Sequence, residues 1–457
     1  GLDPKGEMWK LPASHVGDYA EQDAALTLRL WHYLQREISS QNLVNIFELE
    51  TDLFPVLFKM KQKGVRVDLD KAERIKNDLQ SKENKILRSI KKLTNCDVEV
   101  WAAASVAKAF ESLKISYDRT PTGQPKFDKN FLASHDSPLA QMVVEAREIN
   151  KARTTFIESI TKHSHRGRIH AEIHQMRSDQ GGTVTGRFSY SNPNLQQIPA
   201  RHAILGPLIR SIFIPEKDCE WGIFDYSQQE PRLVVHYATM KQYSGAGQLV
   251  DAYEHDDETD FHQLVADMAD IPRKQAKTIN LGLFYGMGKG KLMSQLGVSL
   301  EEATELLNSY HQRVPFVKQL MNDTMNKASK KGFLFTLEGR RCRFDLWEPT
   351  NEWGSKALPL AEAQREYGES MIKRAWTYKA LNRLIQGSAA DQTKKAMVAL
   401  DKEGYVAHIQ VHDELDFSVA NEKDKDTIKE IMETCVELQV PSKVDVECGK
   451  NWGDAGD

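Results

Sequence analysis

Residues 221–232 place an acid at the end of a strand and start a helix directly after it. Trp221 to Phe224 form a short, mostly apolar run of strand type that ends at Asp225. Pro231 suits the first turn of a helix, where its missing N–H is no loss, and Arg232 to Ala238 continue that helix. The segment therefore predicts a buried strand that presents Asp225 at its exposed end. The alternative is an ordinary strand-to-helix turn in which Asp caps the helix.

A second stretch, residues 406–419, predicts a hairpin with acids at its turn. Apolar residues alternate at 409, 411, 415, 417 and 419, and the turn falls at His412-Asp413-Glu414. If this hairpin lies beside the first strand, Asp225 and Asp413 converge, and the two carboxylates repel each other unless cations lie between them. Carboxylate ligands with open positions suit Mg²⁺. The pair therefore predicts phosphoryl or nucleotidyl transfer with two metal ions.

Length and composition set the outer bounds. A chain of 457 residues is too long for one ordinary core, so we expect two to four domains or subdomains. With 40% hydrophobic and 28% charged residues, no apolar run of membrane-spanning length and no signal-peptide core, we expect an intracellular, cytoplasmic protein without a membrane partner. The five scattered cysteines predict neither a disulfide framework nor a thiolate zinc site.

The distribution of charge indicates more than its total. The net charge of −4 gives no global sign of nucleic-acid binding. From Lys59 to Lys92, however, twelve Lys or Arg stand against five Asp or Glu. This local excess suits a phosphate backbone, and a solvated helix face is the alternative.

The sequence from Asp270 to Gly290 predicts a helix with a cationic face. Asp270 and Pro272 mark its start, and four residues follow at four-residue intervals on one stripe: Arg273, Lys277, Leu281 and Tyr285. Two cations and an aromatic ring on one face suit a triphosphate and a base or sugar, whereas a solvated helix face is again the alternative. The glycines at the end of this segment indicate a hinge or closely packed backbone.

Periodicity predicts the other elements. Helices are expected at 20–34, 47–62, 69–93, 101–113, 131–160, 361–375 and 378–400, strands at 169–174 and 443–448, and a hairpin at 333–344. Residues 181–199 form a long, irregular polar passage, and loops of this length are usually functional or disordered. Polar side chains suited to phosphate or groove-edge contacts lie in this passage and on the helix at 378–400: Arg187, Asn194, Gln196, Gln197, Asn382 and Gln386.

Three segments in order resemble the motifs of one family. DYSQQEPR (225–232), RKQAKTINLGLFYG (273–286) and VHDEL (411–415) resemble motifs A, B and C of the family A DNA polymerases, the bacterial DNA polymerase I type. TGRFSYSNPNLQQIP (185–199) resembles the loop before motif A, and GKNWGDAG resembles the family's C-terminus. The resemblance covers about residues 46–457.

The N-terminus resembles a different part of the same proteins. Residues 15–34, with YAEQD, are similar to the last helix of the family's 3′–5′ exonuclease domain, but the two earlier acidic motifs of that domain are absent. Asp23 therefore lacks the partners needed to hold metals, and we expect no active exonuclease in this chain. Because the sequence starts inside this region, we expect it to be part of a longer protein.

The resemblance implies an α+β, right-hand polymerase fold with an antiparallel palm sheet and mostly helical fingers and thumb. It implies an exonuclease-like remnant at 1–45, the thumb and its base at 46–154, the first part of the palm at 155–232, the fingers at 233–375 and the second part of the palm at 376–457.

The resemblance also implies roles for individual residues. Asp225, Asp413 and the main-chain carbonyl of Tyr226 would hold two Mg²⁺, for which Mn²⁺ can substitute, with Glu414 as an auxiliary acid and Lys277 as proton donor to pyrophosphate. The deoxynucleoside triphosphate would be bound by Arg273, Lys277, Leu281, Tyr285, His262, Glu230 and Gln228, with Glu230 excluding a 2′-hydroxyl. Primer-template DNA would be contacted by Arg187, Asn194, Gln196, Gln197, Asn382, Gln386 and His412.

The implied activity is addition of dNTPs to a primer 3′-hydroxyl with release of pyrophosphate, by a monomer whose replisome partners the sequence does not indicate. A single-subunit RNA polymerase and a catalytically inactive DNA-binding protein are the alternatives. Leu281 departs from the family, which usually has Phe or Tyr there, and Tyr378 occupies a position that is often Arg. A sequence with the family's motifs and leucine at position 281 resembles some phage-encoded members.

Overall fold

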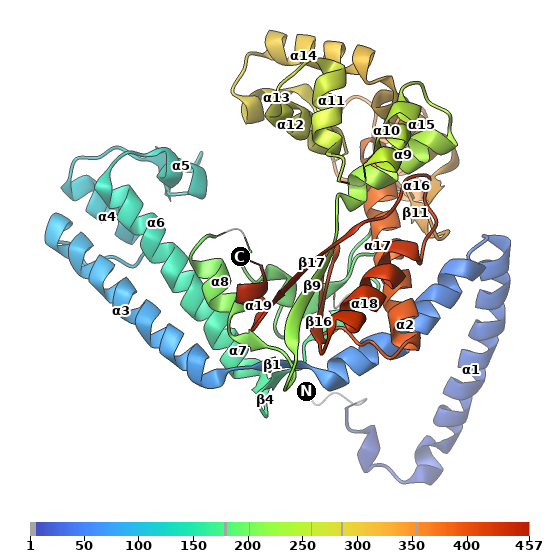
Figure 1. The fold of residues 1–457 in the computed structure, drawn as a ribbon, viewed down its shortest axis with the longest axis horizontal. Helices are drawn as coiled ribbons and strands as arrows, with labels where there is room; N and C mark the ends of the chain where they lie inside the picture. The colour runs from blue at the N-terminus through green and yellow to red at the C-terminus, as the bar shows by residue number, and fades with distance from the viewer. Residues whose placement is uncertain are drawn as a thin grey trace.

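The structure is a computed structural model of the chain, and it describes residues 6–177, 181–200, 202–256, 258–284, 287–352 and 354–456. These residues form the predicted mixture of helices and antiparallel sheets. A central sheet lies between two helical parts, one built from α3 to α7 and the other from α9 to α16 (Figure 1). Within the described ranges, no helix is both long and apolar enough to reach across a bilayer.

The central sheet has four antiparallel strands in the order β15-β16-β9-β17. Its strands are β9 (Glu220–Tyr226), β15 (Ile409–Val411), β16 (Glu414–Val419) and β17 (Val444–Gly449). The strand predicted at 221–224 is β9, and it continues through Asp225 to Tyr226. Phe224 pairs with Leu415 on one side and with Val446 on the other, so β9 is an inner strand. An inner position explains why the run from Trp221 to Phe224 is apolar and buried.

Helices and smaller sheets pack around this sheet. The helices are α2 (Val44–Lys63), α8 (Leu205–Arg210), α17 (Ala380–Lys402), α18 (Glu422–Thr434) and α19 (Trp452–Ala455). A second sheet has the order β4-β5-β1-β8, formed by Ser164–His165, Arg168–Ile169, Val65–Val67 and Phe213–Ile214, and β6 (Glu172–His174) pairs with β7 (Ser189–Ser191). Leu53 and Met60 of α2 share one hydrophobic core with Phe224 and Leu415 of the sheet. The N-terminal half of the chain is therefore attached to the sheet through α2.

Gly64 ends α2 with φ of +62°. A Cβ atom at this position would lie 2.7 Å from the ring of His170, so only glycine fits the turn into β1. Before α2, α1 (Ala13–Ser40) extends away from the rest of the molecule and buries none of its side chains (Figure 1). A short 3₁₀ turn at Met8–Lys10 precedes it.

The first helical part contains α3 (Leu69–Thr94), α4 (Ala103–Ser112), α5 (Lys129–Ser134), α6 (Pro138–Lys151), a π-helical turn (Ala152–Ile157), α7 (Glu158–His163) and the small hairpin β2–β3 (Asp118–Arg119 and Pro125–Lys126). It has its own hydrophobic core around Phe110 and Val143. The single helix predicted at 131–160 was wrong. Ser137 caps α6 and Pro138 is its first residue, so the predicted helix is interrupted between α5 and α6.

The second helical part contains α9 (Gln229–Met240), α10 (Ala246–His255), α11 (Phe261–Ala269), α12 (Arg273–Phe284), α13 (Lys289–Leu296), α14 (Leu300–Arg313), α15 (Pro315–Lys331) and α16 (Leu360–Tyr367). It also contains the hairpin β10–β11 (Phe333–Phe335 and Arg341–Arg343), as predicted at 333–344, and the sheet β13-β12-β14 (Leu358–Pro359, Leu346–Pro349 and Ile372–Arg374). Short 3₁₀ turns lie at Glu369–Met371 and Thr377–Lys379.

Two further predictions of single elements were wrong. The helix predicted at 361–375 ends at Tyr367, because Gly368 has φ of +87° and the chain then enters β14. The strand predicted at 169–174 is interrupted after Ile169, and its two halves, β5 and β6, belong to different sheets. In each segment the sequence pattern fits the predicted element for part of its length, but the backbone changes direction before the segment ends.

Candidate functional site

The acidic hairpin lies against the inner strand of the central sheet, as the sequence predicted. Glu414 on β16 is the register partner of Asp225 on β9, and the N–H of Tyr226 donates to the carbonyl of Asp413 at 3.2 Å. The turn is shorter than predicted, because it consists of His412 and Asp413 alone and Glu414 already belongs to β16. His412 adopts φ of +60°, which suits a tight two-residue turn. Asp225 and Asp413 are thereby brought together at one end of the sheet.

Carboxylates crowd this end of the sheet. Burial and the charges of Asp413 and Glu414 raise the pKa of Asp225 to about 8. Burial also raises the pKa of Asp413 and of Glu414. On the other side of β9, Asp445 of β17 lies directly opposite Asp225. Asp445 is a neighbour that the sequence reasoning missed, although the alternation of Val444 to Glu447 places its acids on one face.

The donor set at this position fits a divalent cation. Oδ1 of Asp225 is buried and has no hydrogen-bond partner among the described residues. A buried carboxylate oxygen without a donor is costly, and a cation satisfies it. In the described part of the chain, no group of three or more His, Cys, Asp and Glu side chains is arranged to enclose a metal ion. Two aspartates with open positions are the expected arrangement for Mg²⁺, which retains water and binds substrate oxygens.

A chain of side-chain amides supports the turn that carries Asp413. Asn194 accepts from the N–H of Gln196 at 3.2 Å, and Nε2 of Gln196 donates to Oε1 of Gln410 at 3.1 Å. Gln410 in turn donates to the carbonyl of His412 at 2.5 Å. The loop 181–199 therefore reaches the acidic turn through Gln196. Gln197, the next residue after Gln196, is exposed.

Arg187 and Glu230 form an ion pair at 2.7 Å. The charge of Arg187 opposes the rise in the pKa of Asp413 and, together with burial, lowers the pKa of His412. The resemblance to family A polymerases implied separate partners for these two residues, the DNA for Arg187 and the sugar of the dNTP for Glu230. The ion pair places both beside the acidic turn.

Helix α12 presents the predicted cations next to His262. Arg273 pairs with Asp260 at 2.5 Å, and Asp260 also caps α11 by accepting from the N–H of His262 at 2.8 Å. Lys277 is exposed one turn further along α12. The charges of both cations act on the imidazole of His262, whose pKa burial lowers to about 4. The two helices thus gather three nitrogen-bearing side chains into one region.

The orientation of the His262 ring is held by residues that the sequence reasoning missed. Nδ2 of Asn280 lies 3.1 Å from Nδ1 of His262, and Oδ1 of Asn280 accepts from the hydroxyl of Tyr310. With the amide donating to Nδ1, the proton of the neutral ring is on Nε2. Asn280 follows Lys277 by one turn, lies next to Leu281 and is fully buried, so its role depends on a partner from α14 that periodicity does not reveal.

The other predicted nucleotide-binding residues have mixed positions. Gln228 has φ of +52°, donates to the carbonyl of Thr259 at 3.0 Å and accepts from the N–H of Phe261 at 2.9 Å, so its side chain links β9 to α11. Leu281 lines a cavity of about 680 Å³ together with Gly282, Gly288 and Tyr378. Tyr285 lies outside the described residues. On α17, Asn382 and Gln386 are half-buried one turn apart.

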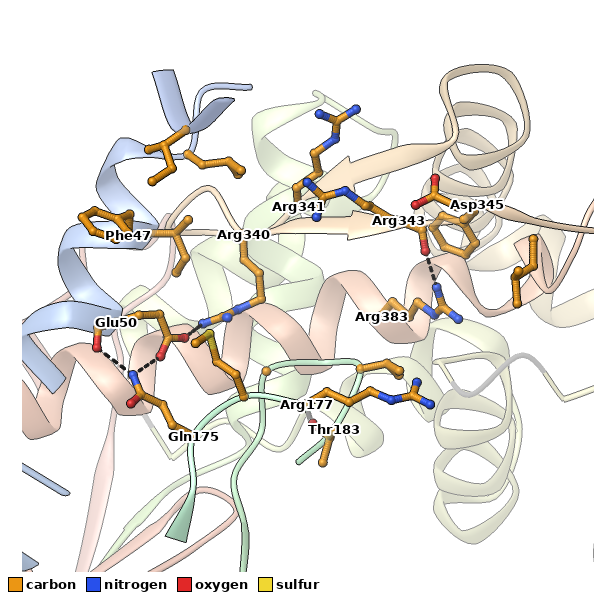
Figure 2. Close-up of a pocket in the computed structure, with 18 of the residues that line it drawn as sticks. Phe47, Glu50, Gln175, Arg177, Thr183, Arg340, Arg341, Arg343, Asp345 and Arg383 are labelled. Carbon is orange, nitrogen blue, oxygen red and sulfur yellow. Dashed lines mark hydrogen bonds and ion pairs between the residues drawn. The ribbon is translucent and has the colours of Figure 1, made fainter. Parts of the chain in front are cut away.

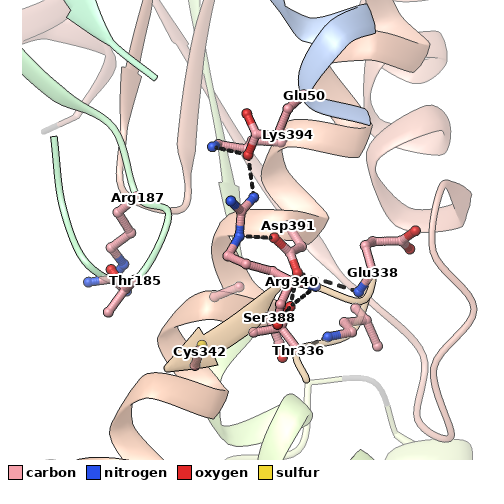
Figure 3. A network of polar contacts seen from close by, with 12 residues as sticks. Glu50, Thr185, Arg187, Thr336, Glu338, Arg340, Cys342, Ser388, Asp391 and Lys394 are labelled. Atoms are coloured by element: carbon pink, nitrogen blue, oxygen red, sulfur yellow. Dashed lines mark hydrogen bonds and ion pairs between the residues drawn. The ribbon is translucent and has the colours of Figure 1, made fainter. Parts of the chain in front are cut away.

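A buried network of charges lies beneath the loop that carries Arg187 (Figure 3). We call Glu50, Arg340, Asp391 and Lys394 the buried ion network. Nζ of Lys394 contacts Glu50 at 2.7 Å, Arg340 pairs with Glu50, and Nε of Arg340 donates to Asp391 at 2.8 Å. The side chains of Lys394 and Asp391 are 0% exposed, so these charges depend on one another.

The buried ion network also holds the loop itself. A Cβ on Gly186, whose φ is +83°, would lie 2.5 Å from Nε of Arg340, so the loop backbone rests directly on this guanidinium. Nζ of Lys394 lies 4.9 Å from the centre of the Phe188 ring. Arg187 is therefore flanked by two residues that rest on buried cations, while its own side chain pairs with Glu230.

Comparison with known proteins places the chain in a family. A sequence profile of DNA polymerase family A matches residues 69–454. The DNA-directed DNA polymerase of Pseudomonas phage M6 is 38% identical, with 99% of this chain and 72% of the relative covered. The DNA polymerase DpoZ of Vibrio phage phiVC8 is 31% identical, with 98% and 72% covered.

Bacterial relatives and a solved structure agree. DNA polymerase I of Pseudomonas aeruginosa is 31% identical, and the match covers 98% of this chain but 48% of that longer protein. The polymerase domain of Pol1 from M. smegmatis, solved with DNA primer-template and dNTP, superposes with a TM-score of 0.77 at 27% identity over 94% of this chain and 75% of that chain. The predicted right-hand polymerase fold is thereby confirmed, and this chain belongs to DNA polymerase family A.

Proposed function

We propose that the acidic end of the central sheet and the cationic face of α12 together carry out the family's reaction, template-directed addition of dNTPs to a primer 3′-hydroxyl with release of pyrophosphate. The observation that supports this assignment is the pairing of β16 with β9, which brings the Asp413 turn beside Asp225. Primer-template DNA and dNTPs are therefore the proposed partners, bound by a monomer.

Asp225 and Asp413 are the proposed side-chain ligands of two Mg²⁺ ions, with the main-chain carbonyl of Tyr226. The buried, unpartnered Oδ1 of Asp225 and the crowding of acids support this choice. When bound, the ions lower the pKa of the primer 3′-hydroxyl and neutralise the triphosphate and the leaving pyrophosphate. Glu414 accepts from Nε1 of Trp452 at 3.3 Å, which keeps this auxiliary acid at the edge of the site.

Arg273, Lys277 and His262 are proposed to bind the triphosphate, and Lys277 to donate a proton to pyrophosphate. The exposure of Lys277 and the proximity of all three side chains support this grouping. Leu281 would face the nucleotide from the same helix, and Tyr285, which lies outside the described residues, is proposed to cover the new base pair. Glu230, held by Arg187, would exclude a 2′-hydroxyl because a fixed carboxylate occupies the space that the hydroxyl needs.

The primer-template would lie in the space between the two helical parts, over the central sheet. Arg187, Asn382, Gln386 and His412 would contact the terminal base pairs, with Asn194, Gln196 and Gln197 nearby. In family terms the thumb would be 46–154, the palm 155–232 with 376–457, and the fingers 233–375. Because the side chains of α2 join the core of the sheet, its residues would form the base of the thumb.

Primer extension with Mg²⁺ tests this proposal. The chain should extend a DNA primer only when the matching dNTP and a template are present, and rNTPs should be used poorly. With dNTPs omitted, the primer should stay intact, because the segment that resembles the exonuclease domain lacks the two acidic motifs that would join Asp23 in a metal site. Efficient synthesis without a primer from rNTPs would instead support the RNA polymerase alternative.

Lys277→Met should lower the single-turnover rate and the affinity for dNTP together. General acid catalysis contributes about 10²–10⁴-fold, so a loss in that range is expected in the chemical step. Lys274→Met is the matched control, because Lys274 is an exposed cation on the same helix, about 60° around the helix axis from Lys277, and the cations that act on His262 are Lys277 and Arg273. A change in Lys277→Met that is confined to DNA affinity would contradict the assigned role.

His262 should act as a neutral hydrogen-bond donor. Because burial lowers its pKa to about 4, dNTP binding should show no His262 titration between about pH 6 and 8. His262→Ala should raise KM for dNTP up to about tenfold, the worth of one neutral hydrogen bond, and His262→Gln should retain most affinity. A KM that follows protonation near pH 6.5 in the native protein and not in His262→Gln would overturn this role.

The same shift predicts how stability changes with acid. A histidine with a lowered pKa in the folded state binds fewer protons there than in the unfolded state, so its contribution is fully present above about pH 6.5. That contribution is lost as the pH falls toward about 4. Unfolding midpoints of the native protein and His262→Gln should therefore diverge across this window and run parallel above it.

A further inference from the structure

A cavity of about 700 Å³ opens between α2, the β10–β11 hairpin and two chain segments, 175–177 and 183–186. We call it the arginine groove. Figure 2 shows the hairpin along one side, α17 across the floor and the segments with Gln175 and Thr183 on the opposite side. The groove does not contain the acidic turn, but its wall includes Gly186, the residue before Arg187.

Four arginines of the groove are not neutralised by acids. Within the described part of the chain, none of these four forms an ion pair with a carboxylate: Arg177, Arg341, Arg343 and Arg383. Arg341 and Arg343 both donate to Oε1 of Gln41 at 2.7 Å, and Arg383 donates to the carbonyl of Arg343 at 2.7 Å. Neutral acceptors orient these guanidinium groups without cancelling their charge.

The arginines also repel one another. Burial, with a further contribution from Arg177, lowers the pKa of Arg383. Of the acids that line the groove, Glu50 is already shared by Arg340 and Lys394, which leaves Asp345. Guanidinium groups gathered without matching carboxylates are suited to phosphate, which accepts two of their hydrogen bonds at once.

Exposed aromatic rings line the same groove. Phe47 and Phe54 on α2 are 37% and 67% exposed, and Trp376, just before α17, is 36% exposed. Large apolar rings are unfavourable in water unless a partner covers them. A basic groove with interleaved aromatic rings is the usual arrangement for unpaired nucleic acid, in which phosphates meet the cations and bases stack on the rings.

We propose that the arginine groove binds the unpaired template strand ahead of the primer terminus. This inference rests on the proposed polymerase function, because the substrate of that reaction has one strand that is necessarily single: the template beyond the primer. The groove is adjacent to the loop that carries Arg187 and to the start of α17, which carries Asn382 and Gln386. A strand leaving the acidic site on this side would enter the groove directly.

The test compares primer-templates with 5′ template overhangs of about two and about ten nucleotides, with binding measured by fluorescence anisotropy. The longer overhang should bind the native chain about tenfold more tightly or better. In the double variant Arg343→Gln/Arg383→Gln this gain should be lost. The slope of log binding constant against log salt concentration, measured with the long overhang, should become shallower by about 0.7 for each arginine removed. Binding and single-nucleotide extension on the short overhang should remain within about threefold of native.

Lys423→Gln is the control, because it removes one exposed positive charge from α18, a helix that does not line the groove. Arg343→Lys keeps the charge at this exposed position and should retain most of the gain, which separates charge from folding defects. Equal losses in Lys423→Gln and the groove variant would overturn the proposal. So would a loss confined to a substrate whose primer, not template, has the unpaired end.

These measurements distinguish a failure of the groove assignment from a failure of the polymerase function. If the native chain extends the primer but gains no affinity from the long overhang, the groove assignment fails and the polymerase function stands. If the native chain does not extend any primer, the proposed function itself fails.

Discussion

Replacing Asp225 or Asp413 with Asn is expected to lower the rate of primer extension by about 10³-fold or more. The loss corresponds to about 4 kcal/mol of transition-state stabilisation, the scale of charge stabilisation by bound metal ions. An Asn side chain keeps the shape of Asp but cannot supply the anionic oxygen that a divalent cation requires. Single-turnover extension of a labelled primer measures the change, and binding of primer-template should remain close to native.

Stability should move in the opposite direction to activity. Asp225 is half-buried, with a buried Oδ1, and the charges of Asp413 and Glu414 oppose its ionisation, so Asn removes a repulsive charge without removing volume. Without Mg²⁺, the unfolding midpoint of Asp225→Asn should equal or exceed that of the native chain. Asp445→Asn, which changes the acid on the other side of β9, is the control and should retain extension within about tenfold. Extension at a near-native rate by either Asp225→Asn or Asp413→Asn would refute the assigned site.

Glu50→Gln is expected to destabilise the fold by about 3–5 kcal/mol. The charges of Lys394 and Arg340 keep the pKa of Glu50 below its ordinary value in spite of burial, so the carboxylate is ionised and compensates both cations. Its replacement leaves two buried positive charges with Asp391 alone. Urea denaturation followed by tryptophan fluorescence measures the change, and the effect should also reach the loop with Arg187 as a weaker discrimination against rNTPs.

Two variants make this prediction specific. Glu172→Gln removes an acid from an ion pair with Lys61 whose side chains are 44% and 45% exposed, and it should change stability by at most about 1 kcal/mol. Adding Lys394→Met to Glu50→Gln removes the cation left without its partner and should recover part of the lost stability. Equal effects of Glu50→Gln and Glu172→Gln would show that the buried ion network adds nothing beyond a surface pair.

The sequence predicted the elements whose pattern is local. β9, the acidic hairpin, α2 with its terminal Gly64 and α12 after Pro272 all have periodic apolar residues bounded by residues that start or end an element. The convergence of Asp225 and Asp413 was predicted on the condition that the hairpin lies beside the strand, and the pairing of β16 with β9 meets that condition. Predictions for 131–160 and 361–375 failed where a local break, at Ser137-Pro138 and at Gly368, interrupts a periodic run.

Partners that are distant in the chain were not predictable. Glu50 and Lys394 are separated by 344 positions, and nothing near either residue indicates that it is buried. In the sequence Asn280 is an ordinary polar residue on a helix, and only the structure shows its hydrogen bonds with Tyr310 and His262. The resemblance to family A polymerases supplied roles for individual residues, but it did not indicate which neighbours hold those residues in place.

The side chain of Gln228 has a consequence for protein engineering. This one amide bonds to Thr259 and Phe261 and so joins the end of β9 to the start of α11. Both bonds are to main-chain groups, so a chimera that exchanges the second helical part between relatives should keep glutamine at position 228, whichever parent supplies residues 259–261. A parent with a different side chain at 228 would leave α11 without this attachment to the end of β9.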